Sequence, residues 1–293
     1  MRAPPRQLAV RGAALGLLCG FLLFGGSAWA LNMTVGDVVV QRLGTYGFTS
    51  NRSVLSLDAG ATDQLFQMFG YLGNANGVVR VDGGSFNTAP GGGIRQVGTN
   101  VAQSNVVLDN NGAASLGLSA GDVGIGYTFT LVDDTSPANR DWFDWDISIT
   151  NNSASTLSLV FYSYLDLDLG GAADFADDVA TGNLNTITVT DANDPLTPYI
   201  WRASGGAASH FGIGAYPSLR NFLDGLASAQ NLSDPTGAFG PADFTGAFQY
   251  DVTLAPGATV LLGSTVPEPG LLAFLVLAAS LLGVRQRVLT SPA

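Results

Sequence analysis

Short runs of alternating apolar and polar residues fill the chain between residues 31 and 264 and predict β-strands. The clearest run lies within 121–134. Its apolar positions would all fall on one face of an extended chain: Val123, Ile125, Tyr127, Phe129 and Leu131. Further runs follow at short spacing, separated by Gly, Asn and Asp. This organisation is typical of an antiparallel β-sandwich, and we predict one all-β domain over 31–264.

Two stretches suggest more local structure. The segment 141–169 predicts a hairpin, because apolar alternation runs up to a polar turn at 151–155 and resumes after it. One short helix is predicted over 218–230, where apolar residues recur at helical spacing after Pro217. These residues are Leu219, Phe222, Leu223 and Leu226.

Composition supports a β-rich chain and excludes one class of partner. Of the 293 residues, 46% are hydrophobic and 12% are charged, 38 are glycines, no lysine is present, and Glu268 is the sole glutamate. Lysine and glutamate favour helices, whereas glycine and aspartate favour turns. A net charge of −11 disfavours contacts with phosphates, so we expect no nucleic-acid partner.

The first 30 residues have the pattern of a secretory signal peptide. Arginines lie at positions 2, 6 and 11, an apolar stretch covers 13–24, and Ala28 and Ala30 form an A-x-A cleavage pattern. We predict cleavage after Ala30. An uncleaved helical anchor is the alternative, although the apolar stretch is shorter than the about 20 residues of a spanning helix.

The segment 265–287 combines three features in a fixed order. A proline-flanked glutamate opens it, an apolar run over 271–284 follows, and arginines close it. The run predicts a single transmembrane helix, and the arginines predict that 288–293 is the cytoplasmic end. The residues of this motif are Val266, Pro267, Glu268, Pro269, Arg285 and Arg287.

This order resembles the PEP-CTERM sorting tail of Gram-negative bacteria, a tail also described as an ice-binding protein C-terminal domain. The resemblance implies that an exosortase in the membrane processes the chain near the motif. It also implies export across the inner membrane, transient anchoring, and delivery to the cell surface or extracellular matrix. Exopolysaccharide is then an expected partner. The resemblance covers the tail and leaves the task of the body open.

Several kinds of catalytic site have no counterpart in the sequence. The single cysteine, Cys19, lies in the signal peptide, and His210 is the only histidine. A nucleophilic triad and a zinc centre both need more of these residues. We therefore expect a structural role for His210 and a protein that is not an enzyme.

Aspartates give the strongest chemical signal in the body. Five of them fall in one short stretch: Asp166, Asp168, Asp174, Asp177 and Asp178. The first two would share a face of a strand, and the glycines that follow would let the chain fold back. Calcium prefers such oxygen ligands. The alternative is a solvated acidic loop, and calcium is the only cofactor that the sequence suggests.

A second group of acids lies beside tryptophans. Asp141, Asp144 and Asp146 surround Trp142 and Trp145. Paired carboxylates with aromatic side chains are typical of sugar-binding and sugar-cleaving sites. The two tryptophans are three apart, so on a strand they would face opposite sides and at least one would lie in the core.

Two hypotheses follow from these patterns. The first is a non-enzymatic surface or matrix protein, sorted by an exosortase and associated with exopolysaccharide or biofilm. The second is a secreted carbohydrate-binding or carbohydrate-active protein, stabilised by calcium.

Overall fold

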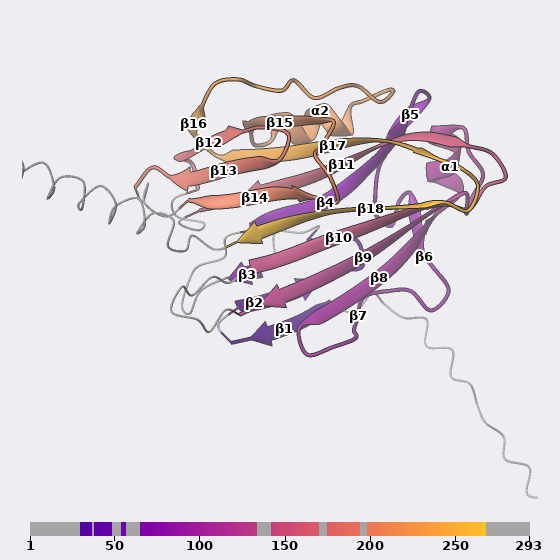
Figure 1. Ribbon diagram of the computed structural model, residues 1–293, viewed down its shortest axis with the longest axis horizontal. Helices are drawn as coiled ribbons and strands as arrows, with labels where there is room; N and C mark the ends of the chain where they lie inside the picture. The colour runs from indigo at the N-terminus through magenta and orange to yellow at the C-terminus, as the bar shows by residue number, and fades with distance from the viewer. Residues whose placement is uncertain are drawn as a thin grey trace, which may run out of the picture.

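The computed structural model describes residues 30–36, 38–48, 54–56, 65–133, 142–169, 175–193 and 198–267. Within these ranges the chain forms eighteen β-strands and two short α-helices (Figure 1). All strand pairs between them are antiparallel, and the strands form three sheets. The expected all-β architecture is therefore confirmed at the level of secondary structure and sheet layering.

The three sheets differ in size. In spatial order the large sheet contains β16 (Phe239–Ala242), β12 (Asp178–Gly182), β13 (Thr186–Asp191), β14 (Tyr199–Ser204), β18 (Thr259–Pro267), β10 (Trp142–Asn151), β9 (Val123–Val132), β8 (Val101–Leu108) and β6 (Phe86–Thr88), with β7 (Arg95–Gln96) also paired to β8. The five-stranded sheet contains β15 (His210–Ala215), β17 (Phe244–Leu254), β11 (Leu157–Leu167), β4 (Leu65–Asn74) and β5 (Gly77–Arg80). The three-stranded sheet contains β1 (Leu31–Val35), β2 (Val38–Leu43) and β3 (Val54–Ser56).

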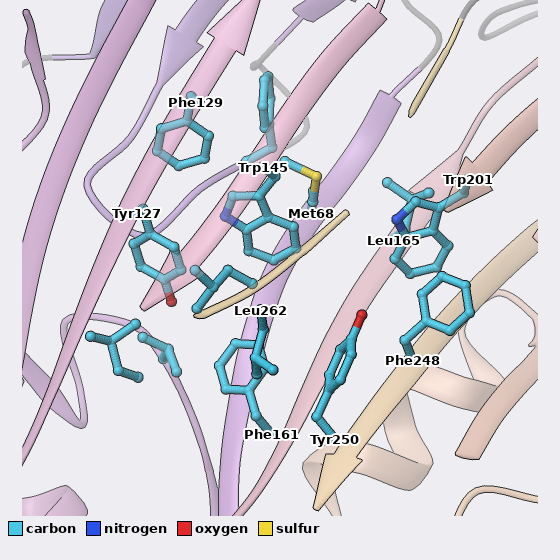
Figure 2. Packing of buried hydrophobic residues seen from close by; sticks show 14 of the residues in the cluster. Met68, Tyr127, Phe129, Trp145, Phe161, Leu165, Trp201, Phe248, Tyr250 and Leu262 are labelled. Carbon is cyan, nitrogen blue, oxygen red and sulfur yellow. The ribbon is translucent and has the colours of Figure 1, made fainter. Parts of the chain in front are cut away.

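The main core lies between the sheets. All five apolar side chains that the alternation placed on one face of β9 are buried. Trp201 of the large sheet packs on Phe248 of the five-stranded sheet with ring centroids 4.5 Å apart, and Tyr127 stacks with Trp145 at 5.9 Å (Figure 2). Aromatic residues of this size bury large apolar areas, so their packing is a major source of the sandwich's stability.

The expected hairpin over 141–169 does not form, and that prediction is wrong. β10 pairs with β9 and β18 in the large sheet, whereas β11 pairs with β17 and β4 in the five-stranded sheet. The turn between β10 and β11 therefore carries the chain from one sheet to the other. The turn between β17 and β18 makes a second crossing of the same kind.

Asn151 ties these two crossings together. Its side chain is fully buried, and its Nδ2 donates to the carbonyl oxygens of Ser155 and Leu254 at 2.7 and 2.8 Å. Its backbone N–H donates to the Ala258 carbonyl, and the Gly257 N–H donates back to the Asn151 carbonyl. A buried amide with this many partners fixes where each strand leaves its sheet.

The described ranges contain two helices instead of the one expected. α2 (Ser218–Asp224) begins where predicted but ends at Asp224, and its Phe222 side chain is 41% exposed. Leu226, beyond the helix, still reaches a smaller core cluster. α1 (Asn110–Leu116) was not predicted, because its seven residues include two asparagines and a glycine, all poor helix formers.

The formation of α1 depends more on the residues that cap its two ends than on the residues of its interior. Asp109 Oδ1 accepts from the backbone N–H groups of Asn111 and Gly112, both at 2.8 Å, and Gly117 ends the helix at φ 64°. We expect Asp109→Ala to lower the free energy of unfolding by about 1 kcal/mol, because two N–H groups lose their acceptor. Denaturant unfolding measures this change. The matched control is Ser115→Ala on the same helix, and an equal loss in both variants would contradict the capping role.

Most of the terminal segments lie outside the described residues. These include the predicted signal peptide up to position 29 and the apolar run over 271–284, so both stay predictions. Among the residues that the structure describes, no helix has the length and apolar character needed to cross a membrane. β18 runs through the boundary that we placed between 264 and 265, so the last strand takes in the start of the expected sorting tail.

Candidate functional site

Three aspartates meet where β11 ends and β17 begins. Asp166 lies in β11, Asp168 follows the strand, and Asp243 stands between β16 and β17. Each offers a carboxylate oxygen, and these oxygens lie within 4.8 Å of one another. Pairing of Asp166 with Thr245 across β11 and β17 sets this approach, because it brings the residues just before Thr245 beside the end of β11. We call these three residues the aspartate cluster.

Asp166 is the buried member of the aspartate cluster. Its side chain is 1% exposed, and no described residue donates a hydrogen bond to either carboxylate oxygen. Burial, with the negative charges of Asp168 and Asp243, raises its pKa to about 9. The Arg220 charge and the nearby Tyr164 hydroxyl act in the opposite direction, although the Tyr164 hydroxyl does not meet the geometry of a hydrogen bond to this carboxylate. The Arg220 guanidinium is also 3.5 Å from Asp224.

A second buried acid lies nearby. Asp178 opens β12 and pairs with Ala242 of β16, the residue before Asp243. Its side chain is fully buried, and within the described ranges neither carboxylate oxygen has a hydrogen-bond partner. Burial raises its pKa to about 8, and the charges of Asp177, Asp191 and Asp168 act in the same direction. This end of the sandwich therefore holds more buried carboxyl groups than the hydrogen bonds of the described residues satisfy.

The structure brings together only part of the aspartate set expected from the sequence. Asp166 and Asp168 meet as expected, and Asp178 lies close enough for the charge of Asp168 to raise its pKa. Asp177 is half-buried, and its Oδ2 accepts from Asn193 Nδ2 at 2.6 Å. Asp174 lies outside the described residues. Asp243 was missed, because no local pattern links it to a strand that ends far earlier in the chain.

The second candidate region is the outer face of the large sheet. Register places one residue from each of six neighbouring strands in a single row on this face: Thr186, Arg202, Thr265, Asp144, Thr130 and Val101. A parallel row contains Ser204, Asp146, Thr128 and Gln103. Strand alternation directs these side chains away from the core. We call the residues of the two rows, together with Trp142, the outer polar face.

Trp142 is the aromatic residue of the outer polar face. Its side chain is half-buried, and its Nε1 donates to Asp144 Oδ2 at 3.1 Å. Trp145 is fully buried on the other side of β10. The spacing argument is thus confirmed, and it selects Trp142 as the tryptophan that a ligand could reach.

Asp144 and Asp146 follow Trp142 on the same side of β10 and differ in environment. Asp144 is half-buried and Asp146 is exposed; partial desolvation by its neighbours still raises the pKa of Asp146, and the charge of Asp144 adds to this effect. A Cβ at Gly263 would collide with the Ser204 hydroxyl and with an Asp146 carboxylate oxygen, so glycine lets these two groups converge above β18. Asp141, the third acid of the predicted group, lies outside the described residues.

The remaining predicted residues are divided between described and undescribed segments. Val266 and Pro267 form the end of β18, where their backbones pair with Phe143 and Trp142. Glu268, Pro269, Arg285, Arg287 and Ala28 lie outside the described ranges, and Ala30 directly precedes β1. His210 Nδ1 is 2.6 Å from Asp234 Oδ2, while Asp234 Oδ1 accepts the Phe211 N–H. These contacts fit the structural role expected for His210.

Comparisons with known proteins identify the fold alone. No protein family and no curated protein matches the sequence. Among solved structures, a bacterial glucoamylase complexed with acarbose matches with a TM-score of 0.54 and 10% identity. The match covers 83% of this chain and 33% of the glucoamylase, so the chain spans about a third of that enzyme's length. A galactose mutarotase-like protein from Lactobacillus casei matches at 7% identity with a TM-score of 0.48, covering 81% of this chain and 99% of that protein.

These likenesses correct one expectation. From the sequence we expected a protein that is not an enzyme. The comparison contradicts this expectation, because the sandwich is shared with a carbohydrate-active enzyme, the glucoamylase. The missing histidines and cysteines excluded triads and zinc sites only, and carboxylates alone can act on sugars. The comparison therefore establishes a β-sandwich fold that is shared with an enzyme, and it removes the ground for expecting that the chain is not one.

Proposed function

We propose that the chain is an exported protein that binds polysaccharide on the outer polar face. The observation that carries the proposal is the position of Trp142, half-buried on β10 beside two carboxylates and next to rows of hydroxyl, amide and guanidinium groups. An aromatic ring can stack on the apolar face of a sugar, while flanking polar groups bind its hydroxyls. The likeness of the fold to the glucoamylase supports a sugar ligand.

Charge narrows the expected ligand class. The net charge of −11 and the paired carboxylates of the outer polar face would repel an acidic polymer. A neutral polysaccharide meets no such repulsion and can accept hydrogen bonds from Arg202 and the threonine hydroxyls. We therefore propose a neutral exopolysaccharide as the natural ligand.

A co-sedimentation screen tests this function. The full-length chain, purified in detergent, is mixed with insoluble neutral polysaccharides such as cellulose and starch granules, and with cross-linked alginate as an acidic polymer. We expect sedimentation with at least one neutral polymer and none with alginate. Binding to alginate alone, or to no polymer, would contradict the proposal.

Cleavage of the bound polymer is a second candidate function. The specific observation in its favour is the Asp144–Asp146 pair on the same side of β10, in which partial desolvation and the charge of Asp144 both raise the pKa of the exposed Asp146. Sugar-cleaving sites need one carboxyl that holds its proton and one that is ionised. Release of reducing ends from the polymer that binds, and its loss in Asp146→Asn, would support cleavage. Binding without release would leave only the binding function.

The route to the cell surface belongs to the same proposal. The signal peptide, the motif over 266–269 and the closing arginines support export and processing by an exosortase. β18 lies between β10 and β14 and runs to Pro267, so the sandwich ends at the motif itself. In cells that contain an exosortase, Glu268→Ala should leave the chain unprocessed and in the membrane fraction. Normal processing of that variant would argue against this route.

A further inference from the structure

Two members of the aspartate cluster, Asp166 and Asp243, have buried carboxylate oxygens without a hydrogen-bond partner among the described residues. Asp166 is 1% exposed to solvent. Both its carboxylate oxygens lack a hydrogen bond from any residue in the described part of the chain. One oxygen of Asp243, Oδ1, is also buried and unpartnered among those residues. A buried polar atom without a partner costs free energy, and a buried charge costs more. Such atoms therefore point to a missing partner.

The geometry suits a cation as that partner. Oxygens from all three carboxylates lie within 4.8 Å of one another. Calcium binds oxygens at about 2.3–2.6 Å, so oxygens on opposite sides of the ion are about 4.6–5.2 Å apart. The positive charge that acts on Asp166 belongs to Arg220, and its guanidinium also donates to Gln67 at 3.3 Å and pairs with Asp224. Arg220 is therefore shared between Asp166, Gln67 and Asp224.

We propose that Asp166, Asp168 and Asp243 bind one calcium ion at the junction of β11, β16 and β17. Their ligand atoms are all carboxylate oxygens, which calcium prefers. Magnesium requires near-ideal octahedral geometry and retains several water molecules, and the burial of Asp166 leaves little space for them. This site differs from the contiguous stretch expected from the sequence, because Asp243 replaces the more distant aspartates of that stretch.

The position of the site implies a structural effect. Asp243 stands where the chain passes from β16 of the large sheet to β17 of the five-stranded sheet, and Asp166 belongs to the five-stranded sheet. A bound ion would hold this crossing to the end of β11. A ligand that binds only the folded state stabilises it by mass action. Calcium should therefore raise the thermal midpoint of the chain.

Calorimetric titration and thermal unfolding of the full-length chain in detergent test the site. After chelation and removal of the chelator, calcium should bind with one ion per chain, with a Kd of about 10⁻³ M or tighter, and should raise the thermal midpoint. The same concentration of magnesium should give a clearly smaller shift. Terbium should bind competitively with calcium and emit after excitation of nearby tyrosine, for which Tyr164 is placed beside Asp166.

Two variants of the aspartate cluster and one control variant test whether calcium binds at the cluster or responds only to the negative charge of the chain as a whole. Asp166→Asn and Asp243→Asn should each weaken calcium binding at least about tenfold and remove most of the thermal shift. Asp251→Asn changes an exposed acid on the same strand, β17, and should bind calcium as the original chain does. If Asp243→Asn fails to fold, Asp166→Asn remains decisive, because its amide has the shape of the neutral acid. No calcium-dependent shift in the original chain, an equal shift with magnesium, or an unchanged shift in both cluster variants would overturn the proposal.

Discussion

Trp142→Ala should weaken binding of the chain to its neutral polysaccharide by about thirtyfold, equivalent to about 2 kcal/mol. The half-buried ring of Trp142 is the aromatic stacking surface of the outer polar face, and its Nε1 donates to Asp144 Oδ2 at 3.1 Å. Removing the ring therefore takes away stacking and also frees a carboxylate that flanks the site. Depletion of the chain from solution at increasing polymer concentration gives the affinity of each variant.

The matched control is Phe222→Ala. Phe222 is also a partly exposed aromatic residue, at 41%, but it lies on α2, which packs beside β15 of the five-stranded sheet. This variant should bind the polysaccharide as the original chain does. Denaturant unfolding of both variants establishes that they remain folded. Equal losses of affinity in the two variants, or full affinity in Trp142→Ala, would contradict the placement of the site.

The second large effect concerns pH. In the presence of a chelator, the free energy of unfolding should fall by several kcal/mol as the pH rises from about 4 to about 9. Burial raises the pKa of Asp166 to about 9 and that of Asp178 to about 8, whereas both acids ionise near pH 4 in an unfolded chain. The folded state therefore holds protons that the unfolded state releases. This stabilisation is complete below about pH 4 and is lost as the pH rises through the folded-state values.

Asp178→Asn tests the origin of this slope. The variant has no carboxyl to ionise at that position, so its stability should depend less steeply on pH between about 5 and 8. Asp251→Asn, which changes an exposed acid, should keep the original slope. Denaturant unfolding at a series of pH values provides the comparison. A chelated chain whose stability stays constant or rises over the same interval would contradict the retention of protons by these buried acids in the folded state.

The sequence predicted features that depend on local alternation. The buried face of β9 follows directly from every second residue being apolar, and the same rule separates Trp142 from Trp145. These predictions succeeded because the two-residue period of a strand is set by backbone geometry alone. The side of the sheet that a residue faces can therefore be read from its neighbours in sequence.

Features that depend on partners distant in sequence were not predictable in this way. The turn after Asn151 looks like a hairpin turn, yet it joins two sheets, because alternation does not say which strands will pair. Asp243 joins Asp166 only through the pairing of β17 with β11. The helix α1 depends on capping by Asp109 and Gly117 rather than on an apolar stripe. In each case long-range or end contacts outweighed local propensity.

The same limit explains the correction about enzymatic activity. The scarcity of histidine and cysteine excludes two kinds of catalytic site, nucleophilic triads and zinc centres, and no others. Carboxylates of the outer polar face gain significance only when the sheet brings them beside Trp142, Arg202 and the threonines. The predicted sorting motif, by contrast, is a contiguous stretch of sequence, so that prediction required no fold, and it stays a prediction.

Hydroxyl-radical footprinting of the full-length chain with and without bound neutral polysaccharide shows which surface the ligand covers. Mass spectrometry reports the oxidation of each exposed aromatic side chain. We predict that polysaccharide protects Trp142 on the outer polar face and leaves oxidation of Phe222 on α2 unchanged. Protection of Phe222, with Trp142 as reactive as in the free chain, would contradict polysaccharide binding on the outer polar face.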